Sequence, residues 1–451
     1  MIESGSLESE HELISRLSQL AICDPLTGLH NRGTLKELFA RILQQATTNR
    51  QSVGIFHIDL DDFSAVNKLH GQAVGDVIIS RIANRLRSIS GETDTIVRTG
   101  GDEFLLISPS DRPDCDFSAK AHHIVGTLRE PHALENGKTI RVTACVGTAI
   151  FPRHGSDDED LIAAAELALH HAKKIGDEVS AFSPEMLITE HRRLILGHDV
   201  GLSLERGELS LVFQPQADAS TSAISGFEAL ARWQHPDFGA VSPADFIPAA
   251  EASGAIGAIG AYVLREACRE ASSWTNGLRV AVNVSPVQIE RGDLVQVVRS
   301  ALIETGLAPE RLEIEVTESL FIQNLAYASK VLNGVKALGV SVALDDFGTG
   351  YSSLGTLRAF PFDRIKIDRS FVFDMVRNSD AAAIVDSVLG LGRAMGLNVV
   401  AEGVETEEQL RLLRMLGCQQ IQGYLIGKPM PAGHYDAVTG KVSKHTSRAM
   451  L

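Results

Sequence analysis

The first part of the chain alternates short apolar runs with stretches of helical periodicity. Ile78, Ile82 and Leu86 recur at helical spacing, whereas two later apolar runs are joined across Gly100 and Gly101, as in a β-hairpin. The segments follow the order strand, helix, hairpin, helix, strand, helix, at 53–58, 78–89, 96–107, 117–130, 139–150 and 158–174. This order predicts an α+β domain over residues 21–181.

Beyond residue 204 the pattern becomes regular, and apolar strands recur with helical stretches between most of them. They lie at 211–213, 226–230, 280–284, 312–316, 341–344, 364–367, 399–401 and 420–424. Eight strands over about 225 residues match a (β/α)8 barrel in length and rhythm. The second part is therefore predicted to be an α/β domain over residues 204–432.

The remaining segments are short. Residues 182–203 are charged and helical in pattern, without richness in Gly, Ser or Pro, so they predict a helical connector. Leu13, Leu17 and Leu20 share helical spacing and predict a short amphipathic helix over residues 1–20. We expect residues 433–451 to form a loose C-terminal tail.

Composition narrows the class of protein. The 451 residues carry a net charge of −15, which argues against binding to a nucleic-acid polymer or an anionic membrane. The five cysteines show no CxxC spacing, so neither a zinc site nor a disulfide framework is indicated. The acidic start differs from a secretory signal, and no run of about 18 apolar residues occurs. We expect a reduced, cytoplasmic protein without membrane insertion.

Polar residues stand within or at the end of every strand of the expected barrel. They are Gln214, Glu228, Asn283, Glu315, Asp345 with Asp346, Lys366, Glu402 and Gln422. In a (β/α)8 barrel the active site lies at the C-terminal ends of the strands. One polar position per strand therefore predicts a site that all eight strands share.

The α+β part resembles the GGDEF domains, which are diguanylate cyclases that join two GTP molecules into cyclic di-GMP. The resemblance rests on Asp24–Arg32, Asp59–Phe63, Asn67, Gly71, Gly75 with Asp76, and Gly100–Phe104. It implies a nucleotidyl-cyclase-like palm. It also implies Mg²⁺ at Asp59, Asp102 and the Leu60 carbonyl, a catalytic Glu103, guanine contacts from Asn67 and Asp76, and a phosphate contact from Lys173.

Several positions depart from the usual GGDEF pattern. Ser64 stands where the family usually has Lys, Lys68 where it has Asp, Gln72 where it has His, and Asp177 where it has Arg. Losing two cations near a triphosphate should weaken GTP binding or misplace its phosphates. The inhibitory RxxD site would need Arg at position 91, where this chain has Gly91, so only Asp94 of that site is present.

The α/β part resembles the EAL family, which are cyclic di-GMP phosphodiesterases. The resemblance covers residues 204–432 and rests on Glu228–Trp233, Asn283–Ser285, Glu315–Glu318, Asp345–Leu354, Lys366–Asp368, Ala401–Glu405 and Gln422–Tyr424. It implies that Glu318 anchors the loop at Asp345–Leu354.

The residue types suit hydrolysis of a phosphodiester by two metal ions, which activate water and clamp phosphoryl oxygens. Mg²⁺ and Mn²⁺ prefer oxygen ligands, and these would come from Glu228, Asn283, Glu315, Asp345, Asp346 and Glu402. Lys366 would offset their charge and orient the water. We expect Lys366, Glu402 and Glu318 to be the catalytic residues. Arg232 suits phosphate, and Gln214, Asp368 and Gln422 suit contacts with the substrate.

Three hypotheses follow. The first is a phosphodiesterase that opens cyclic di-GMP to pGpG, with a GGDEF half that binds GTP and regulates it. The second is a bifunctional cyclase and phosphodiesterase, which the intact Gly100–Phe104 keeps open although the four departures around the GTP site favour the first. The third is a non-catalytic receptor of the nucleotide, which would have no use for the whole metal set. We expect the chain to form a homodimer.

Overall fold

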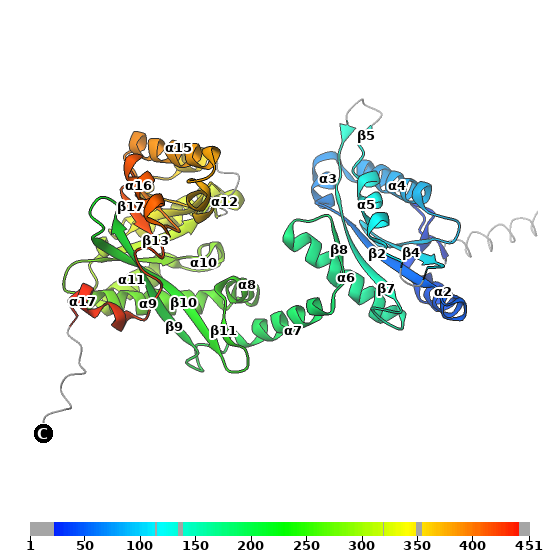
Figure 1. Ribbon diagram of the computed structural model, residues 1–451, viewed down its shortest axis with the longest axis horizontal. Coiled ribbons are helices and arrows are strands. Elements are labelled where there is room, and N and C mark those ends of the chain that lie inside the picture. Colours follow the sequence, from blue (N-terminus) through cyan, green and yellow to red (C-terminus); the bar gives the residue numbers. More distant parts are fainter. Residues whose placement is uncertain (1–21, 113–114, 134–138, 319, 349–353, 442–451) are drawn as a thin grey trace, which may run out of the picture. The chain divides into compact units, whose positions relative to one another are not determined.

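The chain folds into two units, residues 1–192 and 193–451, which are described separately below as unit 1 and unit 2. The computed structural model describes residues 22–112, 115–133, 139–318, 320–348 and 354–441 (Figure 1). The helix expected over residues 1–20 lies outside these ranges. Within them, every helix is too short or too polar to cross a membrane.

Unit 1 is built on a mixed six-stranded sheet in the order β1-β3-β4-β2-β7-β8. Its central strand, β2, is antiparallel to β4 on one side and β7 on the other, while β3 and β4 form the expected hairpin. A separate pair, β5 and β6, lies outside this sheet. The bounds are β1 (His30–Asn31), β2 (Ser52–Leu60), β3 (Thr95–Gly100), β4 (Glu103–Ser110), β5 (His132–Ala133), β6 (Thr139–Ile140), β7 (Ala144–Phe151) and β8 (Val179–Ala181).

Helices cover both faces of this sheet. Phe56 and Ile58 of β2 pack in one core with α4 (Gln72–Ile89) and α5 (Ser118–Leu128). The alternate residues Val53 and Ile55 pack in a second core with α2 (Leu35–Asn49) and α6 (Asp158–Ile175), because successive side chains of a strand point to opposite faces. Two short helices complete the unit, η1 (Arg32–Thr34) and α3 (Phe63–His70). The predicted α+β architecture is confirmed.

Most of the expected connector is a helix, α7 (Pro184–Asp199), which spans the boundary between the two units. Its end is fixed within unit 2, because the Asp199 carboxylate lies 3.1 Å from Nε2 of the buried His235.

Unit 2 is a closed barrel of eight strands (Figure 1). They are β9 (Leu209–Asp218), β10 (Ile224–His235), β12 (Arg279–Asn283), β13 (Leu312–Thr317), β14 (Ser341–Phe347), β15 (Arg364–Ile367), β16 (Asn398–Ala401) and β17 (Gln420–Gln422). A short strand, β11 (Gly239–Val241), pairs with β10 outside the ring. The predicted TIM-like barrel is confirmed.

The barrel departs from eight parallel strands at β9, which is antiparallel to both of its neighbours, β10 and β17. A short turn joins β9 to β10, which is possible only for antiparallel strands, so no helix crosses between them. The other neighbouring pairs in the ring are parallel.

Helices surround the barrel and several begin at side chains that satisfy their first N–H groups. Thr406 and Gln409 form a capping box at the start of α16, and Ser285 and Gln288 form another at α10. The described helices are α8 (Pro243–Ser253), α9 (Ile256–Ser272), α10 (Pro286–Arg291), α11 (Leu294–Thr305), η2 (Pro309–Arg311), α12 (Leu320–Lys336), α13 (Leu354–Ala359), α14 (Arg369–Asp374), α15 (Ser379–Met395) and α16 (Glu407–Met415).

The described part of the C-terminal tail is packed, contrary to the expectation of a loose segment. It forms η3 (Ala432–Tyr435) and α17 (Asp436–Thr439). Tyr435 is buried against Phe227, with ring centroids 4.9 Å apart, and its hydroxyl donates to the Lys428 carbonyl at 2.7 Å. The periodicity of such a short segment gave no signal for this apolar anchor.

Candidate active site

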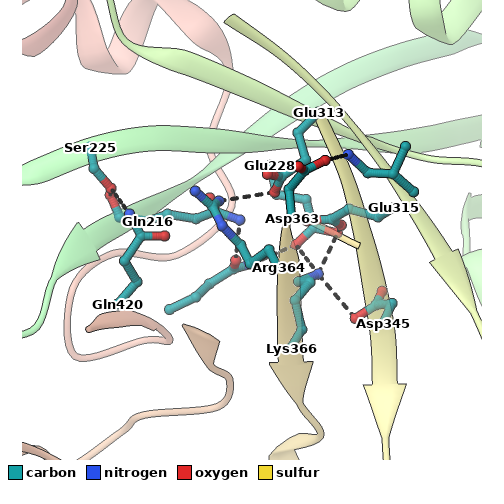
Figure 2. Close-up of polar contacts among 12 residues, drawn as sticks. Gln216, Ser225, Glu228, Glu313, Glu315, Asp345, Asp363, Arg364, Lys366 and Gln420 are labelled. Atoms are coloured by element: carbon teal, nitrogen blue, oxygen red, sulfur yellow. Dashed lines mark hydrogen bonds and ion pairs between the residues drawn. The ribbon is translucent and has the colours of Figure 1, made fainter. Parts of the chain in front are cut away.

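A single buried lysine gathers the acidic strand ends of the barrel (Figure 2). Nζ of Lys366, on β15, lies 2.8 Å from Glu315 and 3.1 Å from Asp345. It lies 2.7 Å from Glu402, which follows β16, and 3.7 Å from Glu228 on β10. Five strands or strand ends expected to share one site are therefore brought together, and we call these five side chains the Lys366 cluster.

Glu228 is oriented by amide side chains. Asn283 Nδ2 donates to its Oε1 and Gln422 Nε2 to its Oε2, both at 2.5 Å. Gln422 also donates to Gln214 Oε1 at 3.1 Å and accepts from Gln216 Nε2 at 3.0 Å. The structure thus brings the expected Gln214, Asn283 and Gln422 to the site, but here they contact Glu228 and one another. Gln216 was not expected, although it stands two residues after Gln214.

The Asp345–Asp346 pair lies in an irregular stretch of β14. The sequence suggested a strand ending at Leu344, but the strand continues to Phe347, and its register with β15 shifts between Leu344 and Phe347. Asp346 has φ +53°, a left-handed conformation that is uncommon for Asp. Carboxylate oxygens of Asp345, Asp346 and Glu402 come within 4.8 Å of one another, so the bulge lets adjacent residues serve one site.

Burial and the charges of neighbouring groups move the pKa values in and beside the Lys366 cluster. The four surrounding carboxylates raise the pKa of Lys366 far above its ordinary value, in spite of burial. Burial and neighbouring carboxylates raise the pKa of Glu402 to about 8, and they raise the pKa of Glu315 as well. Burial and Asp345 raise the pKa of Asp346 to about 6. For Glu228, burial is outweighed by Lys366, Gln422 and Asn283, which lower its pKa.

These residues fit a divalent cation. Oxygen donors dominate the set, as Mg²⁺ and Mn²⁺ require. Oε1 of Glu315 is buried without a hydrogen-bond partner in the described residues, which is costly unless a bound cation or water occupies its lone pairs. Burial and neighbouring carboxylates raise the pKa values of Asp346 and Glu402, and a cation bound there would favour their ionised forms.

Three other expected residues lie at the same ends of the strands. Oε1 of Glu318 accepts from the Gly348 N–H at 3.0 Å, which ties it to the segment following Asp346. Asp368 caps α14 by accepting from the Ser370 N–H at 2.9 Å. Arg232 is half-buried and donates to the Ala231 carbonyl at 2.8 Å. The segment 349–353 of the Asp345–Leu354 loop lies outside the described residues.

One further buried ion pair was missed by the sequence analysis. Arg364 Nη1 on β15 lies 2.9 Å from Glu313 Oε1 on β13 (Figure 2). Burial raises the pKa of Glu313, while Arg364 and Lys366 oppose that rise. A signal was present, because Glu313 and Arg364 each stand two residues before a predicted site residue and so share its face of the strand.

Unit 1 holds a second acidic site at the paired ends of β2 and β4. Asp59 is directly opposite Glu103, and the Leu60 N–H donates to the Asp102 carbonyl at 3.4 Å. Lys173, on α6, lies with Nζ 2.5 Å from Asp59 Oδ1. The structure therefore brings together five residues that the resemblance assigned to metal, phosphate and catalysis.

A pocket of about 520 Å³ opens beside this site. Asn67 and Asp76, expected to contact guanine, line it together with Asp102. The departures Ser64, Lys68 and Gln72 line it too. Gly75 is required next to it, because a Cβ there would lie 1.9 Å from Asn67 Oδ1. Three of the four departures from the GGDEF pattern thus line the same pocket as the expected base contacts.

Two more features of unit 1 bear on this site. His57, which the sequence analysis did not single out, shares the Asp59 face of β2, and its Nε2 lies 3.9 Å from Glu103 Oε2. Burial lowers the pKa of His57. Asp94, the remaining member of the inhibitory RxxD pattern, is buried in an ion pair with Lys120 at 2.5 Å.

Comparison with known proteins places both units. Residues 21–178 match the family described as "Diguanylate cyclase, GGDEF domain", and residues 199–429 match the EAL domain. The chain is 39% identical over 421 residues to the "Bifunctional diguanylate cyclase/cyclic di-GMP phosphodiesterase MucR" of Pseudomonas aeruginosa, covering 92% of this chain and 61% of that protein. The chain spans between about half and two thirds of the length of the curated relatives that it matches.

Solved structures agree with this assignment. "PaMucR Phosphodiesterase, c-di-GMP complex" is 44% identical, with a TM-score of 0.51, covering 53% of this chain and 98% of that one. "Vibrio cholerae LapD S helix-GGDEF-EAL (bound to c-di-GMP)" covers 93% of this chain and 100% of that one, with a TM-score of 0.63; at 18% identity it shows a shared fold alone. The chain therefore belongs to the EAL-domain family and carries a GGDEF domain before its EAL domain.

Proposed function

We propose that unit 2 hydrolyses cyclic di-GMP to pGpG and that unit 1 binds GTP and regulates this reaction. The observation that carries the proposal is the Lys366 cluster, in which one buried ammonium lies among four carboxylates at the strand ends. The printed names of the relatives support the substrate, since MucR is named as a cyclic di-GMP phosphodiesterase and its solved structure as a complex with that nucleotide.

Mg²⁺ or Mn²⁺ would be held by Glu228, Asn283, Glu315, Asp345, Asp346 and Glu402. Two such ions would activate the attacking water and shield the charge that develops on the phosphoryl oxygens. Lys366 holds Glu315, Asp345 and Glu402 in place and supplies positive charge beside the reacting phosphate. Gln422 and Asn283 orient the Glu228 carboxylate. Arg232, Gln214 and Asp368 would contact the nucleotide.

The regulatory part of the proposal rests on the pocket in unit 1. Asn67 and Asp76 supply polar contacts for a guanine, and Lys173 with Asp59 marks where phosphates and metal would meet. Ser64 and Asp177 remove two cations that the GGDEF pattern usually has, so GTP bound there would have its phosphates poorly placed for condensation.

A bifunctional enzyme is the second candidate. The intact Gly100–Phe104 sequence, with Glu103 opposite Asp59, favours it, and MucR is named as bifunctional. A non-catalytic receptor is disfavoured, because nucleotide binding alone gives no reason to bury Lys366 among Glu228, Glu315, Asp345 and Glu402.

The proposal includes a homodimer. Phe373 on α14 and Ile384 on the adjacent α15 are large apolar side chains that are 64% and 40% exposed in the single chain. Association through unit 2 would cover them. Light scattering on the purified chain tests this, and a monomer at micromolar concentration would contradict it.

One assay tests the central proposal. The full chain is incubated with cyclic di-GMP, and separately with GTP, each with Mg²⁺ or Mn²⁺, and the products are separated by chromatography. We expect pGpG from cyclic di-GMP, no turnover in excess EDTA, and no turnover by Glu228→Ala. Saturating GTP should change the rate of hydrolysis by about 5- to 150-fold, the usual range for coupled sites. Full turnover in EDTA would refute the metal site, and an unchanged rate with GTP would refute the regulation.

A further inference from the structure

A second ion pair lies one layer away from the Lys366 cluster, toward the N-terminal ends of the strands (Figure 2). Arg364 and Glu313 are 3% and 2% exposed, with 2.9 Å between Nη1 and Oε1. Glu313 precedes Glu315 by two residues on β13, and Arg364 precedes Lys366 by two on β15. Side chains two residues apart share a face of a strand, so the barrel interior holds two stacked pairs of carboxylate and cation.

Both carboxylates have an unused oxygen. Oε2 of Glu313 and Oε1 of Glu315 are buried and lack a hydrogen-bond partner in the described residues. The guanidinium of Arg364 carries five N–H donors and keeps its charge at any physiological pH. Glu315 stands only about 7 Å further along the same strand face than Glu313. If Glu313 were removed, Glu315 would therefore be the nearest carboxylate on β13 with which Arg364 could pair.

We propose that Glu313 is a positioning residue, which binds Arg364 and so keeps the guanidinium from pairing with Glu315. Glu315 then stays with Lys366 and presents its other oxygen to a divalent cation. The activity readout of this inference rests on the proposed phosphodiesterase function, whereas the placement of Glu315 can be measured through metal binding alone.

The two partners of this pair are not equivalent. A buried guanidinium that loses its partner keeps its charge. Removing Glu313 therefore leaves a cation that must find another carboxylate. Removing Arg364 removes the cation that could draw Glu315 away from Lys366. A pair that served stability alone would not produce this asymmetry in metal binding.

The test uses the full chain with Glu313→Gln, Arg364→Met and the double variant. Glu270→Gln is the matched control, since it removes a carboxylate that pairs with Lys441 at 2.7 Å outside the barrel interior. Mn²⁺ affinity is measured by calorimetry, and hydrolysis of cyclic di-GMP and the melting temperature are measured in parallel.

We expect Glu313→Gln to weaken Mn²⁺ binding and to slow hydrolysis by about 10- to 100-fold, the usual effect of losing a residue that orients a metal ligand. Arg364→Met should lose less Mn²⁺ affinity and less hydrolytic activity. In the double variant, the Mn²⁺ affinity and the rate of hydrolysis should both lie within a few-fold of the wild type. Glu270→Gln should leave both unchanged.

Wild-type Mn²⁺ affinity in Glu313→Gln would overturn the inference, and so would equal losses in the two single variants. If Glu313→Gln does not fold, the double variant decides: near-wild-type Mn²⁺ affinity supports the inference, and a loss as large as 10-fold overturns it. A wild-type chain that binds Mn²⁺ but hydrolyses no cyclic di-GMP would refute the proposed function, while the Mn²⁺ affinities would still decide the role of Glu313.

Discussion

Lys366 and Glu315 face each other inside the barrel with 2.8 Å between Nζ and Oε2, and their side chains are only 1% and 0% exposed. Burying an ammonium is costly unless carboxylates surround it, and breaking such a pair costs several kcal/mol. Three further carboxylates lie within 4 Å of the same nitrogen. The four carboxylates therefore keep the ammonium group of Lys366 ionised and restrain its position.

Replacing this lysine should separate binding from hydrolysis. We expect Lys366→Ala to slow hydrolysis of cyclic di-GMP by at least about 100-fold, the scale for a positioned electrostatic or proton-transfer group. Binding of the nucleotide in Ca²⁺ should change little, because the proposed contacts from Arg232, Gln214 and Asp368 are kept. Lys441→Ala removes another ion-paired lysine of unit 2 and serves as the control. Hydrolysis by Lys366→Ala near the wild-type rate would show that the lysine has no catalytic role.

The stabilising effect of a metal should increase with pH. In the metal-free protein Asp346 and Glu402 have pKa values of about 6 and about 8, above their ordinary 3.8 and 4.5. The folded state therefore binds more protons than the unfolded state between pH 3.8 and about 6 at Asp346, and between pH 4.5 and about 8 at Glu402. The free energy of unfolding falls as the pH rises through these windows. A divalent cation binds the ionised carboxylates, so it must displace these protons at low pH.

Calorimetric melting of the full chain at pH 6 and pH 8, in EDTA and in Mn²⁺, checks this. We expect a larger Mn²⁺-induced rise in the melting temperature of unit 2 at pH 8 than at pH 6. Glu402→Gln should reduce the difference, because it removes the group with the higher pKa. Equal shifts at the two pH values would contradict a cation at Asp346 and Glu402.

The contact between Glu318 and Gly348 should control the segment that carries Asp345 and Asp346. Glu318 Oε1 accepts the Gly348 N–H at 3.0 Å, and Gly348 has φ +102°, which only glycine adopts readily. We expect Glu318→Ala to slow hydrolysis by about 10- to 100-fold through misplaced carboxylates. Glu318→Gln keeps an oxygen acceptor and should recover most of the rate. Equal loss in both variants would point to the charge of Glu318 instead.

Periodicity was sufficient to predict the architecture of both units and the strand that carries each residue of the Lys366 cluster. Alternation of apolar and polar residues along these parallel strands marks the face that carries Glu228, Glu315 and Lys366. The antiparallel course of β9 could not be read in the same way, because its apolar core is short and strand direction leaves no mark on hydrophobic pattern.

The remaining differences arise from tertiary contacts. The bulge that turns Asp346 to φ +53° depends on pairing with β15, which local sequence does not specify. Glu313 and Arg364 share strand faces with predicted site residues, but local sequence does not show that the two pair with each other across the barrel. His57 was passed over because its burial beside Glu103 depends on the register of β2 with β4. In each case the missing information is which strand lies opposite.

Synthesis of cyclic di-GMP should be weak or absent in this chain. Condensation needs two triphosphates held so that a 3′-hydroxyl of one faces the α-phosphate of the other. Cationic side chains usually bind these phosphates together with the metal. Here Ser64 lines the pocket where the GGDEF pattern has lysine. Asp177 stands where that pattern has arginine, just after α6, the helix that carries Lys173, and its carboxylate accepts the Glu178 N–H at 2.7 Å.

The Glu228→Ala background prevents destruction of any product, so cyclase activity can be measured there with GTP and Mg²⁺. We expect little cyclic di-GMP from Glu228→Ala alone, and an increase of at least about tenfold when Ser64→Lys and Asp177→Arg are added, because both changes restore charge stabilisation at the phosphates. Adding Glu103→Gln should abolish this gain, which links it to the site opposite Asp59. Robust synthesis by Glu228→Ala alone would make the chain a two-way enzyme, since Lys173 would then suffice to hold the phosphates.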